Sequence, residues 1–216
     1  MNLKQPLILF GAGGHAKVLL SLIQAAGFNV LGVCAPELVH QGIDCWRGLP
    51  VLNIKDDNLK AFFPNQVALV NGVGHQVRRQ QLFEQFKAQG YHFPVLIHSH
   101  AYVDPSAILN EGVQVMAGAV IQADACIGNN VIINTRASVD HDCVIGDHVH
   151  IAPGAVLCGD VHVCQGAFIG SGATVAHGIK VSERATAGAG VSVVRDLPSG
   201  CIILPASIRV KEGRTE

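Results

Sequence analysis

The chain has 216 residues, and its 15 Lys and Arg almost balance its 16 Asp and Glu, which gives a formal net charge of −1. A chain without a charge excess is not expected to bind nucleic acid or an anionic membrane surface. Its apolar runs are all shorter than the roughly 18 residues of a membrane helix, so we expect no membrane insertion, no signal peptide and a cytoplasmic location.

The N-terminal stretch has the pattern of a βαβ unit. We expect a strand over residues 6–10, a glycine turn, a helix over residues 14–26 and a second strand over residues 30–33. This order is typical of the first unit of a nucleotide-binding α/β fold. The turn reads GAGGHA, and Gly13 and Gly14 would let the backbone approach a diphosphate at the positive end of the helix. The alternative is a tight strand-to-helix connection that binds nothing.

A second glycine turn follows a third predicted strand, over residues 67–70. The turn reads NGVGH, and a helix predicted over residues 76–89 comes after it. Because this turn also lies at the carboxyl end of a parallel strand, Gly72 and Gly74 should face the same crevice as the first glycine turn. A fourth strand is predicted over residues 94–97.

Two features of this region argue against NAD as the ligand. The unit has fewer than a hundred residues, which is short for a full doubly wound domain. Cys34, Ala35 and Pro36 follow the second strand where an acid that binds the ribose is expected, and Glu37 is the nearest carboxylate. Two adjacent arginines in the helix after the second turn, Arg78 and Arg79, could touch a phosphate, but at least one of them should be an ordinary solvated residue.

From Val103 to Val193 every sixth residue is apolar, and fifteen of these sixteen residues are Val, Ile or Leu. Four residues after each stands a second apolar residue, most often a small one such as Ala119 or Ala137. This period fits neither an α-helix nor a simple strand, but it is the signature of a hexapeptide β-helix. Three hexapeptides form one coil, so about 18 residues separate stacked positions, and successive coils lie about 4.8 Å apart. We expect about five coils with the aliphatic side chains inside.

The segment over residues 133–150 carries more polar residues than the rest of the array. His141 and Asp142 are adjacent in it, and one coil later the position of His141 is taken by Gly159. A glycine there leaves a slot beside the imidazole, and an imidazole next to carboxylates has no packing purpose, so we interpret His141 as functional. Other histidines of the array are expected at the surface or at corners: His148, His162 and His177.

The seven cysteines are odd in number and show no CxxC spacing. This pattern favours reduced thiols over disulfides or zinc, and we expect no metal site.

Four stretches of the chain are similar to one family: GAGGHAKV, NGVG, LIHSHAYV and above all NTRASVDHDCVIGDHVHIAPGAVLCGDV. The chain resembles the bacterial nucleotide-sugar acetyltransferases of surface-glycan synthesis, and the resemblance covers nearly its whole length. These proteins include N-acetyltransferases of UDP-linked 4-amino-4,6-dideoxy sugars and others assigned as sialic acid O-acetyltransferases. The resemblance implies an N-terminal Rossmann-like α/β domain followed by a left-handed parallel β-helix, acetyl-CoA as co-substrate, and a homotrimer with shared sites.

The resemblance also implies roles for single residues. His141 would be the general base, and Asp142 would orient its imidazole. The residues implied or expected to bind the sugar nucleotide are Gly13, Gly14, His15, Gly72, Gly74 and Asn134. The residues implied to lie near acetyl-CoA are His150, Gly159, Ser171, Gly188 and Ala189. Among them, the backbone N–H of Gly159 is implied to meet the thioester carbonyl.

The chain departs from the family pattern at three places. An acidic pair that the family uses for uracil is Ala35 and Pro36 here. Cys164 stands where a corner glycine is common, and Ile203 replaces a glycine before a hydrophobic-Pro-Ala motif close to the CoA tail.

We therefore divide the chain into a nucleotide-sugar-binding domain (1–97), a β-helix domain (98–197) and a tail (198–216). We predict acetyl transfer from acetyl-CoA to the 4-amino group of a UDP-linked amino sugar. Two alternatives stay open: O-acetylation of sialic acid or another sugar, and a trimer that binds nucleotide sugars without catalysis. An NAD-dependent enzyme is disfavoured by the missing ribose acid.

Overall fold

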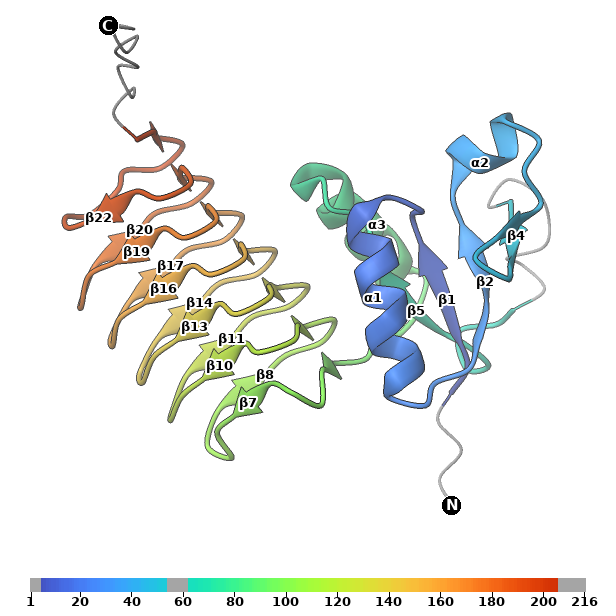
Figure 1. Ribbon diagram of the computed structural model, residues 1–216, viewed down its shortest axis with the longest axis horizontal. Coiled ribbons are helices and arrows are strands. Elements are labelled where there is room, and N and C mark those ends of the chain that lie inside the picture. The colour runs from blue at the N-terminus through green and yellow to red at the C-terminus, as the bar shows by residue number, and fades with distance from the viewer. Residues whose placement is uncertain (1–4, 54–61, 206–216) are drawn as a thin grey trace, which may run out of the picture.

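The computed structural model describes residues 5–53 and 62–205, which form an α/β domain followed by a stack of short parallel strands (Figure 1). Most of the predicted tail lies outside the described residues. None of the helices in the described part of the chain has the length and apolar content of a membrane span.

The predicted βαβ elements are present with bounds that differ by one residue at most from those expected. They are β1 (Leu7–Phe10), α1 (Gly14–Ala25), β2 (Val30–Cys34), β5 (Ala68–Asn71) and α3 (Gln76–Ala88). β1 lies between β2 and β5 and runs parallel to both. Every residue of β1 and β5 is buried, which is expected where both faces of a parallel sheet are covered.

Three further elements were not expected from the sequence. They are α2 (Pro36–His40), β3 (Cys45–Trp46) and β4 (Leu49–Leu52), and they extend the sheet to the order β3-β4-β2-β1-β5. Pro36 lies in the first turn of α2, where the missing N–H of proline leaves no helical hydrogen bond unmade. The three elements are too short to show a helical or alternating period, so the pattern did not reveal them.

The rest of the chain forms the predicted left-handed prism of two-residue parallel strands (Figure 1). Face 1 consists of β6 (Leu96–Ile97), β9 (Gln114–Val115), β12 (Ile132–Ile133), β15 (His150–Ile151), β18 (Phe168–Ile169), β21 (Thr186–Ala187) and β23 (Ile202–Ile203). Face 2 consists of β7 (Tyr102–Val103), β10 (Val120–Ile121), β13 (Ser138–Val139), β16 (Val156–Leu157), β19 (Thr174–Val175) and β22 (Ser192–Val193). Face 3 consists of β8 (Ile108–Leu109), β11 (Cys126–Ile127), β14 (Val144–Ile145), β17 (His162–Val163) and β20 (Lys180–Val181).

The core of the prism is the column of aliphatic residues that the period predicted. Each position of that series from Val115 to Val193 is buried, and the two at the start of the stack, Val103 and Leu109, are partly buried. Strands pair at a spacing of 18 residues, as Val120 does with Ser138. The six-residue period is therefore confirmed as the basis of the fold.

The corners of the prism have a backbone requirement that the sequence analysis did not identify. Every sixth residue from 112 to 190 has a positive φ, and seven of these fourteen corner residues are not glycine. Asp142 and His148 are two of the seven, each with a φ of 61°. The left-handed conformation at Asp142 is rare for a residue with a side chain, and it shapes the turn that carries His141.

The α/β domain packs against face 1. The strand predicted over residues 94–97 occurs as β6, but it pairs with β9 of the prism and not with the N-terminal sheet. The outward side chains of Gln114 and Ile132 on face 1 are buried. Arg79 of α3 is also fully buried, and its guanidinium donates to the backbone carbonyls of Asn130 and His148 in the prism.

Candidate active site

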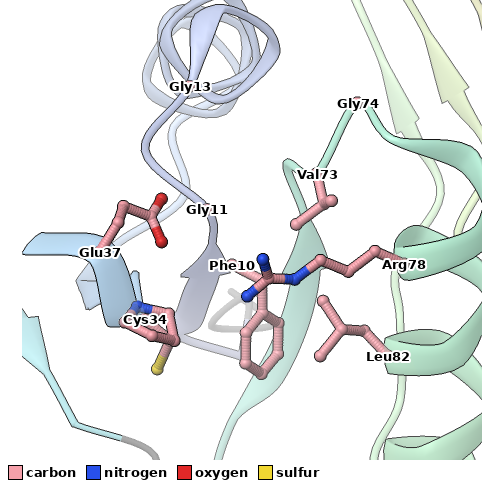
Figure 2. A pocket seen from close by; sticks show the side chains of 10 residues that line it. Phe10, Gly11, Gly13, Cys34, Glu37, Val73, Gly74, Arg78 and Leu82 are labelled. Atoms are coloured by element: carbon pink, nitrogen blue, oxygen red, sulfur yellow. The ribbon is translucent and has the colours of Figure 1, made fainter.

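A cleft lies at the carboxyl ends of β1, β2 and β5, the place where parallel α/β sheets bind ligands. It is lined by the first glycine turn, the second glycine turn, the start of α2 and the side chains of Arg78 and Leu82 on α3. Figure 2 shows Glu37 and Arg78 pointing into it from opposite sides. Among the described residues neither of these two side chains forms an ion pair. One carboxylate and one guanidinium therefore remain free to bind a ligand.

The four predicted glycines do not share one role. Gly13 and Gly74 line the cleft, and Gly14 opens α1 with free space where a side chain would stand. Gly72 is different, because a Cβ there would lie 2.7 Å from the backbone oxygen of Phe10 and 2.9 Å from the Cβ of Ala16. Gly72 thus permits close packing between β1, β5 and α1, and this packing brings the two glycine turns together.

His141 and Asp142 form a hydrogen-bonded pair at the turn between β13 and β14. The Nδ1 atom of His141 lies 2.7 Å from Oδ2 of Asp142, and both side chains are more than half exposed. On the other side, the backbone N–H of His141 donates to Oδ1 of Asp140 at 2.8 Å. The hydrogen bond from Asp142 raises the pKa of His141, and the charges of Asp140, Asp142 and Asp160 add to this effect.

Gly159 lies directly beside this imidazole, as the 18-residue spacing predicted. A Cβ on Gly159 would lie 2.5 Å from Cε1 and Nε2 of His141. Gly159 is a buried residue, and its backbone N–H donates to no acceptor among the described residues. This N–H is therefore available to a ligand atom that enters next to His141.

His150 and Asn134 form a second polar pair, on face 1 and at the edge between faces 1 and 2. Nδ2 of Asn134 lies 3.1 Å from Nε2 of His150, whose ring packs edge-on against Phe168. Burial lowers the pKa of His150 to about 3, with smaller contributions from Arg79 and His15. His150 is therefore neutral at physiological pH.

His15 lies close to this second pair, at the start of α1. Its Nε2 atom is 2.8 Å from Oε1 of Gln114 on β9, and burial lowers its pKa. His15 was predicted from the sequence as a substrate-binding residue, and Gln114 was not. A polar residue at an outward strand position gave no sign of function, because its burial depends on the docked α/β domain.

The structure corrects the interpretation of His148. It was expected at the surface or at a corner, and it does occupy a corner, but only 4% of it is exposed. Its Nδ1 atom lies 2.9 Å from Nδ2 of Asn130, and its ring packs edge-on against Phe83 of α3. The docking of α3 covers this corner, so His148 belongs to the interface between the domains.

The remaining predicted residues follow the edge between faces 1 and 2. Ser171 and Ala189 are exposed there. Gly188 is buried, and Ile203 packs so closely against it that an added Cβ would lie 2.9 Å from the backbone oxygen of Ile203. His141, Asp142 and Gly159 instead follow the edge between faces 2 and 3, which lies opposite face 1. A single chain thus does not bring the two groups of predicted residues together.

No group of three or more His, Cys, Asp or Glu side chains within residues 5–53 and 62–205 is arranged to hold a metal ion. All seven cysteines are free.

Comparisons with known proteins identify both parts of the chain. The sequence profile of the PglD N-terminal domain matches residues 6–86, and that of the bacterial transferase hexapeptide (six repeats) matches residues 124–159. No curated protein sequence matches the chain.

Several solved structures match nearly the whole chain. The acetyltransferase domain of PglB from Neisseria gonorrhoeae FA1090, in complex with acetyl coenzyme A, is 39% identical, with a TM-score of 0.83 over 92% of this chain and 95% of that one. PerB from Caulobacter crescentus, in complex with CoA and GDP-perosamine, is 36% identical, with a TM-score of 0.84 over 92% of this chain and 93% of that one. WeeI from Acinetobacter baumannii AYE shares the fold at 23% identity, with a TM-score of 0.82 over 93% and 96% of the two chains.

The chain belongs to this family of sugar acetyltransferases. The order of its domains, an α/β domain followed by a hexapeptide β-helix, is that of the family. The expected fold and the expected relatives are thereby confirmed.

Proposed function

We propose that the protein transfers the acetyl group of acetyl-CoA to the 4-amino group of a nucleotide-linked amino-dideoxy sugar. The observation that carries this proposal is the His141–Asp142 pair beside the unpaired N–H of Gly159. The expected nucleotide is UDP, and the N-terminal cleft is its expected site. A relative crystallised with GDP-perosamine makes GDP the second nucleotide to test.

The geometry supports a direct transfer. Asp142 accepts a hydrogen bond from the Nδ1–H of His141, which leaves the lone pair of Nε2 toward the slot beside Gly159. The neutral amine attacks the thioester carbonyl carbon, and the N–H of Gly159 stabilises the negative charge that develops on the carbonyl oxygen. His141 takes a proton from the attacking nitrogen and gives it to the departing sulfur as the C–S bond breaks. The products are the N-acetyl sugar and CoA.

We further propose that the active site is shared in a homotrimer. The α/β domain covers face 1, whereas His141 lies on the opposite edge of the same prism. A sugar nucleotide in the cleft of one chain could then meet the imidazole of a neighbouring chain. Three prisms packed side by side would bring the edge that carries His141 in one chain toward the α/β domain of the next.

The test is release of CoA from acetyl-CoA in the presence of UDP- and GDP-linked 4-amino sugars, with free amino sugars and sialic acid as comparison acceptors. We expect turnover with one of the nucleotide-linked 4-amino sugars. His141→Ala should lower kcat/KM by about 10²- to 10⁴-fold, the usual contribution of a positioned acid-base group. Turnover with sialic acid alone, or a fully active His141→Ala trimer, would overturn the proposal.

A further inference from the structure

Gln114 connects the prism to two elements of the α/β domain. It is 2% exposed, on β9. Its Nε2 atom donates to the backbone oxygen of Asn71 at the end of β5, and its Oε1 atom lies 2.8 Å from Nε2 of His15 on α1. The Asn71 contact is also 2.8 Å long. One buried amide therefore joins both ligand-facing turns of the α/β domain.

These two contacts determine the tautomer of His15. The backbone oxygen of Asn71 can only accept, so the amide group of Gln114 that faces it must be the NH₂. The atom that faces His15 is then the amide oxygen, which also can only accept. Nε2 of His15 must carry a proton, and its Nδ1 atom holds a lone pair whenever the ring is neutral.

Nδ1 of His15 is left for a ligand. Burial lowers the pKa of His15, and the nearby cation of Arg79 lowers it further. No side chain or backbone group in the described part of the chain donates to this atom. His15 follows Gly14 at the start of α1, and its Cβ lies 3.8 Å from the position of a Cβ on Gly74. The lone pair thus belongs to a side chain that stands between the two glycine turns.

The same reasoning gives His150 the opposite tautomer to that of His15. The backbone N–H of Thr135 donates to Oδ1 of Asn134 at 2.8 Å, which fixes the orientation of that amide. Nδ2 of Asn134 then donates to Nε2 of His150. The neutral ring of His150 must carry its proton on Nδ1. Nδ1 of neutral His15 is therefore a hydrogen-bond acceptor, whereas Nδ1–H of neutral His150 is a donor.

We propose that Gln114 is a positioning residue that holds His15 as a hydrogen-bond acceptor for an uncharged hydroxyl or amide N–H group of the sugar. This inference rests on the proposed function, and within the sugar nucleotide it assigns His15 to the sugar rather than to the diphosphate. A lone pair on Nδ1 repels a phosphate oxygen, whereas a hydroxyl donates to it. The Nδ1–H of His150 supplies a donor for a neighbouring acceptor group of the sugar.

The tautomer can be measured without substrate. In protein labelled with ¹⁵N-histidine, with the signal of His15 assigned by loss in His15→Ala, the spectrum at neutral pH should show a protonated Nε2 and an unprotonated Nδ1. Gln114→Glu replaces the amide by a carboxylate, which should raise the pKa of His15 and protonate Nδ1 at that pH. Gln85→Glu, on the exposed side of α3, adds the same charge elsewhere and should change neither signal.

Binding then identifies the ligand group. Calorimetry compares two pairs of ligands, each a free nucleoside diphosphate and its sugar nucleotide: UDP with UDP-N-acetylglucosamine, and GDP with GDP-mannose. It shows which of the two nucleotides the wild type binds. For the pair that binds, Gln114→Glu should lower the affinity for the sugar nucleotide about three- to tenfold, the usual effect of one lost hydrogen bond. It should not lower the affinity for the free diphosphate. Gln85→Glu should bind both as the wild type does.

Three results would overturn the inference. One is a wild-type His15 with its proton on Nδ1. Another is a Gln114→Glu variant that binds the diphosphate and the sugar nucleotide more tightly to the same degree, since a cationic His15 beside the phosphates would do so. The third is a folded Gln114→Glu variant with unchanged binding of the sugar nucleotide. If no nucleotide binds the wild type, the proposed function fails, and the tautomer measurement still tests the role of Gln114.

Discussion

At the scale of single residues, the pair of His141 and Asp142 sets the pH dependence of the reaction. The hydrogen bond from Asp142 raises the pKa of His141, and only the neutral imidazole can accept a proton. Activity should therefore fall in acid at a higher pH than an ordinary histidine would give. Asp142→Asn removes the charge and should move this acid limb of kcat/KM to lower pH. An unmoved limb in Asp142→Asn would mean that another group titrates.

Gly159 permits a test of the slot beside the imidazole. In Gly159→Ala the new Cβ would lie 2.5 Å from Cε1 and Nε2 of His141, so the ring must turn away from its position. We expect kcat/KM to fall by at least about tenfold while the prism stays folded, because misplacement of a catalytic group by about 1 Å is costly. Steady-state kinetics and circular dichroism measure the two effects.

The matched control for this substitution uses the double variant. If Gly159→Ala acts only through the imidazole, it should cost little further activity in a His141→Ala background. Equal losses in both backgrounds would show instead that Gly159→Ala disturbs the site by another route.

The sequence identified His141 because residues at a spacing of 18 stack, and the glycine above it stood out in that column. The same spacing could not show that His148 is buried or that Gln114 contacts His15. Both depend on where the α/β domain docks, and no periodic pattern encodes that placement. Gly72 was grouped with the ligand-facing glycines for a related reason, since its close contact with Phe10 becomes visible only when the sheet is assembled.

At the scale of elements, Arg79 and Gln76 attach α3 to the prism. The guanidinium of Arg79 donates to the carbonyls of Asn130 and His148, and Gln76 adds three contacts to carbonyls of residues 148, 166 and 167. No carboxylate in the described part of the chain pairs with Arg79, and burial lowers its pKa to about 10. Carbonyl dipoles therefore hold this buried cation in place.

Replacement of Arg79 should loosen the α/β domain. Arg79→Met keeps the apolar stem of the side chain but removes hydrogen bonds from a charged donor, which are worth about 1.5–3 kcal/mol each. We expect a fall in the free energy of unfolding of that order and separate thermal transitions for the two domains. Arg78→Met is the control, because Arg78 is exposed and should leave the unfolding curve unchanged. A single unshifted transition in Arg79→Met would contradict this role.

The elements also differ in how well the sequence foretold them. The prism could be predicted strand by strand, because one period repeats sixteen times and each repeat buries the same position. In contrast, α2, β3 and β4 are two to five residues long, too short to display a period. Pro36 and Glu37 were named from the sequence, but the helix α2 that places them at the cleft was not predicted.

At the scale of the whole molecule, four exposed apolar side chains lie on faces 2 and 3 of the prism, the two faces against which the α/β domain does not pack. Tyr102 and Val156 on face 2 are 50% and 39% exposed, and Ile108 and Val144 on face 3 are 58% and 45% exposed. These two faces meet at the edge that carries His141. A neighbouring chain placed there would bury apolar surface and close the site at once.

Complementation between subunits tests the shared site. His141→Ala chains keep an intact cleft, and Gly13→Leu chains, whose new side chain enters the cleft, keep an intact base. Each homotrimer should be nearly inactive. Random mixing of equal amounts after co-expression should restore about a quarter of the wild-type activity, because two adjacent chains then supply one intact cleft and one intact base in about that fraction of sites. Native mass spectrometry first confirms that the trimers contain both kinds of chain. If mixed trimers are then no more active than the two homotrimers, the cleft and His141 of a single chain act together and the shared site is wrong.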